Sequence, residues 1–467
     1  MTRYRILMCA GMTVALAGCT TATLPPSDPT TRVPIPADFI ADARPDAGTG
    51  ERWWRGFEDP ELNALVDTAL DRNREIAAAR SRLGAAAALV RAERSDLLPS
   101  LDASVGADVA IDQGPGIGED VGASLGGALP IDLNGRLSAE IAAALADLDA
   151  ATYFVADQRR VIAAAVATQY LERRRTGARL ALLETSTELQ EQTLEIVTLR
   201  YDAGLSSNLD VRRAAADLAR TRAQLGQLQL ARARASNALS VLTGDPPAPI
   251  PPSREEATIP TYEGGPSVGL PLDLLRRRPD LLIAEAELAN AAAVVGVERA
   301  DLLPTLTLPG SILLGDGSIG GLVTNVVAQV GALLGVPLFD GGRRRAETAA
   351  AEFELEARFA DYSQRLLSVY SEVETALVAI EAFDQRTRQL RLAVEESEAA
   401  FSQSNALYRE GLASLFEVLD VQRQLISSRE ALIDSEADLA QSHVDLYRVV
   451  GAPTCPASPG EDPGVVC

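Results

Sequence analysis

Few residues of this sequence could do chemistry. Its 467 residues include one histidine, His443, and four cysteines. A single histidine cannot build a multi-ligand metal site, and the chain has neither a glycine-rich phosphate loop nor a nucleophile elbow. We therefore predict no enzymatic activity, no metal and no cofactor. The groups that remain are the cysteine thiols and the many carboxylates.

The clearest of these groups is the thiol of Cys19. Two arginines precede an apolar run over residues 6–16, which is too short for a permanent membrane span. Small residues follow, directly before Cys19. This segment resembles a bacterial lipoprotein signal that is cleaved before Cys19, whose thiol and amine would then carry acyl chains such as palmitate. An ordinary secretory signal with a chance cysteine is the alternative.

Export decides how the other cysteines are interpreted. Cys9 leaves with the signal, so that Cys455 and Cys467 remain as thiols in a tail rich in proline and glycine. An oxidising compartment permits disulfides. A disulfide between Cys455 and Cys467 is therefore a hypothesis, although two cysteines do not fix a pairing.

The carboxylates dominate the charge. The chain carries 65 acidic and 43 basic residues, all of them arginine, for a net charge of -22. This balance argues against nucleic acid as a partner, because binding to phosphate backbones needs a basic face. It also argues against simple adsorption to anionic lipid.

The elements that must position these groups come in two copies. Residues 93–101 recur as residues 298–306 with two changes, a spacing of 205, and later blocks recur at a spacing of 207. The later pairs are Pro130, Gly135 and Arg136 with Pro337, Gly342 and Arg343, and Tyr201, Gly204, Leu205 and Val211 with Tyr408, Gly411, Leu412 and Val418. Repeats of this length indicate two homologous halves.

Each half is predicted to contain a helical stretch, a strand pair and a long helical hairpin, in that order. The predicted segments are a signal peptide (1–18), a lipidated tether (19–50), a first repeat (51–250), a second repeat (251–451) and a tail (452–467). The strand pairs are expected over 100–132 and 305–338, and the hairpin tips near 201–210 and 408–417.

The first strand pair has a clear pattern. Apolar and small or polar residues alternate over residues 101–111 and again over residues 121–131. Alternation over about 11 residues suits a tilted membrane-spanning strand with its apolar side toward lipid. A soluble hairpin with one buried face is the alternative. The second pair is more apolar throughout, which leaves its register open.

The hairpin helices are unusually long. Residues 137–200 and 343–407 contain no proline, and about 64 residues would reach about 95 Å as a helix. The return helix of the second half carries a heptad stripe of Val418, Leu425, Leu432, Leu439 and Leu446. Such a stripe predicts coiled-coil packing.

The strands require more than one chain. A sheet in lipid must close on itself, and bacterial barrels begin at about eight strands. Four strands per chain therefore predict an oligomer, whose number of copies the strands do not decide.

Three further blocks carry a resemblance to a known family. They are Trp-Trp at 53–54 with Phe-Glu-Asp-Pro-Glu-Leu at 57–62, Leu-Arg-Arg-Arg-Pro-Asp-Leu at 275–281, and Pro-Leu-Phe-Asp-Gly-Gly-Arg at 337–343. With the duplicated Tyr-x-x-Gly-Leu turns, the chain resembles the TolC-like outer-membrane efflux factors, in their lipoprotein (NodT-type) branch.

The resemblance implies a mainly α fold with a small transmembrane β part. It implies a homotrimer, in which an α-helical barrel is continuous with a shared twelve-stranded β-barrel. The implied function is the exit duct of a tripartite efflux pump in the outer membrane of a Gram-negative bacterium. The implied partners are a periplasmic adaptor, an inner-membrane transporter of the RND type and outer-membrane lipid.

The resemblance also suggests site residues at the two helical turns. It implies adaptor contacts at Gly204, Leu205, Ser206, Gly411 and Leu412. It places Asp210 in a network that closes the periplasmic tip, and Glu417 and Asp420 in acidic rings that narrow the pore. Ala413 departs from the family pattern, because an arginine partner can occur there, so the closing salt bridge is in doubt.

The sequence is also compatible with two other functions. The outer-membrane component of a type I protein-secretion system uses the same kind of duct. A lipid-anchored periplasmic coiled-coil scaffold would have soluble hairpins and no conductance. The sequence does not identify the transported substrate.

Overall fold

The computed structural model describes residue 40 and residues 52–111, 117–247, 258–263, 278–317 and 325–450. The chain forms two compact units, and each takes segments from both halves of the sequence. Unit 1 contains Ser81–Tyr153 and Leu281–Gln364, and unit 2 contains Ile35–Arg80, Phe154–Asp280 and Arg365–Cys467. Among the described residues, every helix is too polar or too short to serve as a membrane span.

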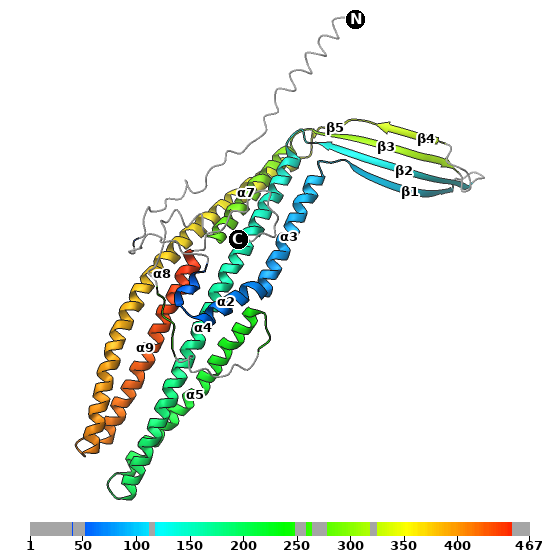
Figure 1. Cartoon of the computed structure of the whole chain (residues 1–467). Coiled ribbons are helices and arrows are strands. Elements are labelled where there is room, and N and C mark those ends of the chain that lie inside the picture. Colours follow the sequence, from blue (N-terminus) through cyan, green and yellow to red (C-terminus); the bar gives the residue numbers. More distant parts are fainter. Residues whose placement is uncertain are drawn as a thin grey trace. The chain divides into compact units, whose positions relative to one another are not determined.

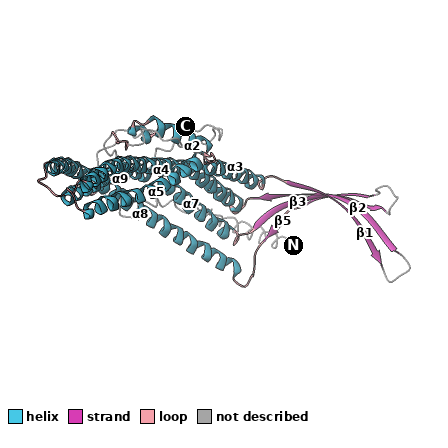
Figure 2. Cartoon of the chain, turned by 90° about the horizontal axis from the view of Figure 1, so that it is seen from below, coloured by secondary structure: helices cyan, strands magenta, loops and turns pink. Residues whose placement is uncertain are grey.

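The strands of unit 1 form one antiparallel sheet in the order β1-β2-β3-β4 (Figure 1). The strands are β1 (Ser100–Ile111), β2 (Ile117–Ile131), β3 (Thr305–Gly317), β4 (Asn325–Val330) and β5 (Leu333–Gly335). The central pairing joins β2 to β3, so strands from the two halves of the sequence meet in the middle. In Figure 2 these strands, in magenta, extend together as one ribbon.

The registers place apolar residues on one face. Leu101 and Val105 of β1 lie opposite Gly127 and Ala123 of β2, and the polar partners Ser104 and Ser124 share a hydrogen bond of 2.7 Å on the other face. The apolar set continues across the sheet. It includes Leu125, Leu129, Ile131, Leu306, Leu308, Ile312, Leu314, Val326, Ala328 and Val330.

The second strand pair is interrupted once. A continuous strand would run opposite Pro309 of β3, which has no N–H to donate to the ladder. Here β4 ends at Val330, Gly331 N donates to Pro309 O, and β5 resumes at Leu333. The partners Gly310 with Val330 and Thr307 with Leu333 keep one register. The short strands β4 and β5 therefore lie end to end and together occupy the fourth strand position, or lane, of the sheet.

Two helices form where the sequence predicts one helical stretch at the start of the first half. They are α2 (Pro60–Arg72) and α3 (Arg74–Ser95). Between them Asn73 has an extended backbone; its Oδ1 accepts from the N–H groups of Glu75 and Ile76, and its Nδ2 donates to Leu242 O at 2.9 Å. The polar side chain therefore ends one helix and caps the next.

The long hairpins lie where the sequence predicts helices. The first consists of α4 (Arg136–Asp202) and α5 (Asn208–Thr243), and the second of α8 (Arg343–Arg409) and α9 (Leu415–Val450). The helix α7 (Pro279–Ala300) precedes the second strand pair.

The heptad stripe of α9 is largely buried: Val418, Leu425 and Leu446 are all in the core. A neighbouring row of serines is equally buried, and Ser435 Oγ lies 2.9 Å from Thr387 Oγ1 on α8. Small hydroxyl side chains thus let α8 and α9 approach closely, and they pair with each other.

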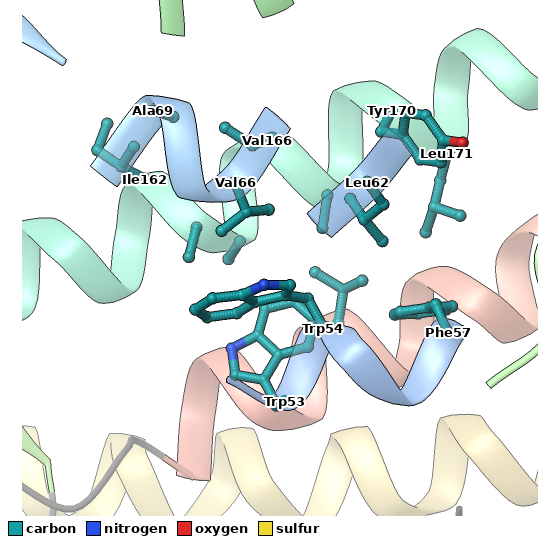
Figure 3. Close-up of a cluster of buried hydrophobic side chains, with 14 of the residues drawn as sticks. Trp53, Trp54, Phe57, Leu62, Val66, Ala69, Ile162, Val166, Tyr170 and Leu171 are labelled. Carbon is teal, nitrogen blue, oxygen red and sulfur yellow. The ribbon is translucent and has the colours of Figure 1, made fainter. Parts of the chain in front are cut away.

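The main core of unit 2 surrounds the short helix η3 (Trp53–Phe57) (Figure 3). Trp53 and Trp54 lie beneath Leu62 and Val66 of α2, and α4 closes the cluster. The α4 residues in the cluster include Ile162, Val166, Tyr170 and Leu171. Trp53 also stacks on Tyr447 of α9, with ring centroids 5.5 Å apart. The two tryptophans of the Trp-Trp block therefore pack in the hydrophobic core.

Candidate functional site

The turn between α4 and α5 closes with a glycine in the left-handed region. Gly204 has a φ of +72°, its N–H donates to Tyr201 O, and Leu205 N–H donates to Arg200 O at 2.7 Å. These two bonds form a Schellman motif, which satisfies the last carbonyls of α4. A side chain at Gly204 would meet nothing, so only its backbone conformation requires glycine.

The turn between α8 and α9 repeats this geometry. Gly411 has a φ of +76°, and its N–H donates to Tyr408 O, while Leu412 N–H donates to Leu407 O at 2.8 Å. The duplicated Tyr-x-x-Gly-Leu block therefore encodes one turn twice.

Both turns present apolar side chains to solvent. Leu205 is 72% exposed and Leu412 is 76% exposed, and Leu209 and Phe416 are also exposed. Large apolar side chains gathered at a helical tip mark a surface that can bind a partner.

Asp210 completes a capping box at the start of α5, in which Ser207 is the N-cap residue. Ser207 Oγ accepts from Asp210 N, and Asp210 Oδ2 accepts from Ser207 N at 3.2 Å and from the hydroxyls of Ser207 and Ser206 at 2.7 and 3.2 Å. These hydrogen bonds, those from Ser207 first, hold the pKa of Asp210 below its usual range. The carboxylate is therefore charged at neutral pH, and it accepts these hydrogen bonds from residues of its own turn.

Glu417 has the same role in the second turn. Ser414 N donates to Glu417 Oε2 at 3.0 Å, and Glu417 N donates to Ser414 Oγ at 3.3 Å. Asp420 lies one turn further along α9 and is exposed, with Arg423 at 3.3 Å as its ion-pair partner. Within the described chain, each of these three carboxylates thus has a local partner.

The two tips are joined by packing. Val197 of α4 forms a small cluster with Leu415 and Leu419 of α9, against which Val211 and Tyr408 pack. The guanidinium of Arg200 lies 4.8 Å from the ring centre of Tyr408. Arg213 lies 5.5 Å from the ring centre of Phe416. These two cation–π contacts join the tips. Ala413 has no charge and cannot form the salt bridge that an arginine at its position could make.

Buried ion pairs hold the chain further from the tips. The guanidinium of Arg278 binds Asp280 in a bidentate pair of 2.9 and 2.6 Å, and it also donates to Glu372 and to Val449 O. Arg365 adds a contact of 2.9 Å to Asp280. The Arg-Pro-Asp block therefore ties the start of α7 to α8 and α9 in unit 2.

A second network anchors α2 to α4. Asp59 caps α2, and its Oδ2 accepts from Tyr170 at 2.5 Å and from Arg174 at 2.9 Å. Burial alone would raise the pKa of Asp59, but these hydrogen bonds and the charge of Arg174 lower it. Glu61 pairs with Arg173 alongside.

The structure thus groups the predicted adaptor contacts and gate carboxylates around two adjacent turns. Sequence reasoning missed Ser207 and Ser414, although a serine three residues before an acidic residue is the signal of a capping box. It also missed Arg200 and Arg213. In the described part of the chain no cluster of side chains could hold a metal ion. Cys19, Cys455 and Cys467 lie outside the described residues.

The chain is similar to proteins of known families. The model of a family described as outer membrane efflux protein matches residues 65–245 and 270–452. The pyoverdine export outer membrane protein OpmQ of Pseudomonas aeruginosa is 30% identical, over 93% of this chain and 94% of that protein. Nodulation protein T of Rhizobium leguminosarum bv. viciae is 29% identical, over 94% of this chain and 92% of that protein.

A solved structure has the same fold. The outer-membrane channel OprN superposes with a TM-score of 0.82 at 30% sequence identity, and the match covers 90% of this chain and 98% of that chain. The sheet and the two long hairpins of this chain are therefore the architecture of a channel protomer, as the sequence predicts.

Proposed function

Because the chain belongs to the outer membrane efflux protein family, we propose that it is the exit duct of a tripartite efflux pump. It is an outer-membrane efflux component of a Gram-negative bacterium, with the fold of a TolC-like channel. Its family consists of channel-forming proteins, and the proposed duct carries out no reaction.

The observation that carries the proposal is the amphipathic sheet. Among the strand residues whose side chains are described, none is buried, although one face is apolar across all four lanes. A soluble hairpin would bury that face against a core. An apolar face without a core suits contact with lipid. The opposite face is more polar and suits an aqueous lumen, because it carries Ser104, Ser124 and Ser311 beside the apolar Leu313 and Leu333.

The edges of the sheet support a trimer. Within the described chain, β1 and the lane of β4 and β5 each have one unpaired edge. Lipid cannot satisfy these backbone groups, so copies must pair edge to edge until the sheet closes. Three copies would supply twelve lanes, which lies within the known range of such barrels.

The tips are proposed to bind the periplasmic adaptor of an RND-type transporter. Gly204, Leu205 and Ser206 would make the main contact, and Gly411 and Leu412 the second. Both turns are rigid, because two main-chain hydrogen bonds and a serine cap fix each of them, and both expose a leucine. Rigid exposed anchors bind at a low cost in conformational entropy.

Asp210, Glu417 and Asp420 are proposed to shape the periplasmic gate. Threefold symmetry would place three copies of each carboxylate around one axis, and such rings attract cations. The capping bonds of Asp210 and Glu417 mean that opening must move whole turns rather than single side chains.

The lipid anchor is proposed at Cys19, which would hold the tether at the membrane surface after cleavage of the signal. A disulfide between Cys455 and Cys467 is proposed for the tail. Mass spectrometry of the intact purified protein tests both, because acylation adds mass at the mature N-terminus and reduction of a disulfide adds two hydrogens.

The channel is tested by conductance. Purified protein in a planar bilayer should open discrete, cation-selective channels, and it should run as a trimer in mild detergent. A lipid-anchored scaffold would give neither result, and that outcome would overturn the proposal.

The tip contact is tested by photo-crosslinking in living cells. A photoreactive amino acid at Ser206 should capture a periplasmic adaptor, whereas the same amino acid at the exposed Thr185 on α4, away from the tips, should not. Capture of an adaptor that works with an ATP-driven protein exporter would favour type I secretion. If the amino acid at Ser206 captures only other copies of this chain, the proposed docking site is wrong and the proposed duct still stands.

A further inference from the structure

A short segment of unit 2, residues 258–263, lies against the aromatic core around η3. It belongs to the chain between α5 and α7, and therefore to the link between the two repeats. Tyr262 Oη donates to Tyr447 Oη on α9 at 2.8 Å, and Glu263 N donates to Gly56 O at 2.9 Å. We call residues 258–263 the strap.

The strap fits closely against η3. The ring of Tyr262 meets Phe57 edge to face, with ring centroids 5.1 Å apart, and Ile259 packs against the same core. A Cβ added at Gly56 would lie 2.5 Å from Cε2 of Tyr262. Non-bonded carbon atoms prefer a separation of about 3.5–4.0 Å. The closed position of the strap therefore requires a glycine at residue 56.

One ionisable ring lies beneath the strap. The imidazole of His443 is 7% exposed and stacks on Tyr262, with ring centroids 4.8 Å apart and an angle of 22° between the planes. Its Nδ1 is buried and has no hydrogen-bond partner in the described chain. Burial lowers the pKa of His443 to about 4, so the ring is neutral at neutral pH.

The charges around His443 would do little to stabilise a proton on it. Asp384 of α8 acts to raise the pKa of His443, but its carboxylate already forms an ion pair with Arg388. Other ionisable side chains on the elements packed around the ring do not shift that pKa. They are Arg55 of η3, Tyr262 and Glu263 of the strap, Tyr447 of α9, and Glu381 and Arg388 of α8.

A proton on His443 makes the closed arrangement unfavourable. A charged imidazole loses its hydration inside the aromatic core, and contact of the cation with the face of Tyr262 offsets only part of that loss. The strap is short and belongs to no helix or strand. Moving it is therefore the smallest change that gives the charged ring access to water.

We propose that the strap is an acid-sensitive switch, in which protonation of His443 releases residues 258–263 from η3 and α9 while the helices stay folded. The link between the two repeats is then bound to the core at neutral pH and free of it in acid. This switch is independent of the proposed duct, because it needs only contacts within unit 2 of one copy.

Thiol accessibility in the full-length protein tests the release. In a Cys455→Ser, Cys467→Ser background, Ile259→Cys places a thiol where the strap packs on the core, and Ala167→Cys places one where the core is fully buried. A disulfide reagent that reacts in acid measures the rate for each thiol relative to free cysteine. The rate for the background protein is subtracted.

The two thiols should respond differently to acid. The rate at residue 259 should rise by up to about tenfold for each pH unit between about pH 6.5 and pH 4, because release takes up one proton. The thiol at residue 167 should stay protected. A constant rate at residue 259 would contradict the switch. If both thiols become reactive together, unit 2 unfolds as a whole and the switch is wrong.

Two variants separate the proton from the packing. His443→Phe keeps a ring against Tyr262 but takes up no proton, so acid should no longer raise the rate at residue 259. Gly56→Ala should displace Tyr262 and give a high rate at residue 259 already at neutral pH, with residue 167 still protected. Circular dichroism checks that both variants are folded.

Either variant can overturn the proposal. An undiminished response to acid in His443→Phe would show that another group triggers the release. Protection of residue 259 at neutral pH in Gly56→Ala would show that the contact with η3 does not hold the strap. Neither result depends on whether the parent protein forms a trimer or a channel.

Discussion

Buried ion pairs in this chain join neighbouring helices. Asp280 is almost fully buried, yet it faces the guanidinium groups of Arg278 and Arg365. Burial would raise its pKa, but the hydrogen bonds and charge of Arg278, with the charges of Arg160 and Arg365, lower that pKa to about 2. Removing one partner of such a pair leaves a buried charge uncompensated, which is costly.

The stability that Asp280 provides should depend on pH. Its pKa of about 2 in the folded chain lies below the ordinary value of 3.8, so the stabilisation is complete above about pH 4 and is lost as the pH falls toward 2. The shift corresponds to about 2 kcal/mol. Asp280→Asn should be less stable than the parent at pH 7, and denaturant midpoints should converge near pH 2. A gap that stays constant across this range would contradict the role.

His443 should give a pH dependence at a milder pH. It is buried against Tyr262, with ring centroids 4.8 Å apart, and burial lowers its pKa to about 4 although Asp384 opposes the shift. Because the folded chain prefers the neutral ring, stability present above about pH 6.5 is lost as the pH falls toward 4, by about 3 kcal/mol.

The variant His443→Phe keeps a ring on Tyr262 but cannot take up a proton. Its melting temperature should therefore change less than that of the parent between about pH 6.5 and pH 4. Parallel curves for the two proteins would show that folding does not lower the pKa of His443, and that its ring is not buried in the assembled protein.

At the scale of elements, the helical turns are determined by a few local residues. Each combines a glycine in the left-handed region with a serine cap, and neither glycine has any atom within 4 Å of an added Cβ. The cost of alanine at Gly411 is therefore the backbone conformation alone. Left-handed backbone costs an L-residue about 1–2 kcal/mol.

Alanine substitution at Gly411 and Gly226 should have opposite effects. Gly226 lies inside α5 with a free surface around it, so Gly226→Ala should stabilise the chain by about 0.5–1 kcal/mol. Gly411→Ala should destabilise it by about 1–2 kcal/mol. Thermal unfolding followed by circular dichroism measures both. Destabilisation by Gly226→Ala would mean that a neighbouring copy contacts that position.

The elements that depend on local pattern could be predicted from the sequence. The alternation of apolar and polar residues predicted the positions of β1 and β2, and the long stretches without proline predicted those of α4 and α8. The break at Asn73 was missed, although an asparagine that caps the next helix through the N–H groups of Glu75 and Ile76 is a local signal. Only its second bond, to Leu242 O, depends on a residue that is distant in the sequence. The interruption between β4 and β5 was missed because it depends on which residue lies opposite Pro309.

The same division applies to the candidate site. The turn glycines and exposed leucines follow from short motifs, and the capping serines could have been found in the same way. The contact of Arg200 with Tyr408 joins two helices of different repeats, so it depends on tertiary packing that no local pattern encodes.

At the scale of the whole molecule, the sheet must satisfy two environments with adjacent residues. Ile312 and Ser311 are neighbours in the middle of β3, in the second lane from one edge. Ile312 lies opposite Leu125 of β2, and Ser311 lies opposite Gln329 of β4. The first residue is therefore on the apolar face and the second on the polar face.

Arginine substitutions at these two positions should show which face of the sheet contacts lipid and which faces the lumen. A charged side chain on the lipid face near the middle of a bilayer costs about 2–4 kcal/mol. Ile312→Arg should therefore reduce the amount of assembled protein in the outer membrane, while Ser311→Arg should assemble and shift the conductance away from cations. Membrane fractionation and bilayer recordings measure the two effects. Equal assembly of both variants would mean that the apolar face contacts protein or water rather than lipid, and the membrane assignment of the sheet would then have to be abandoned.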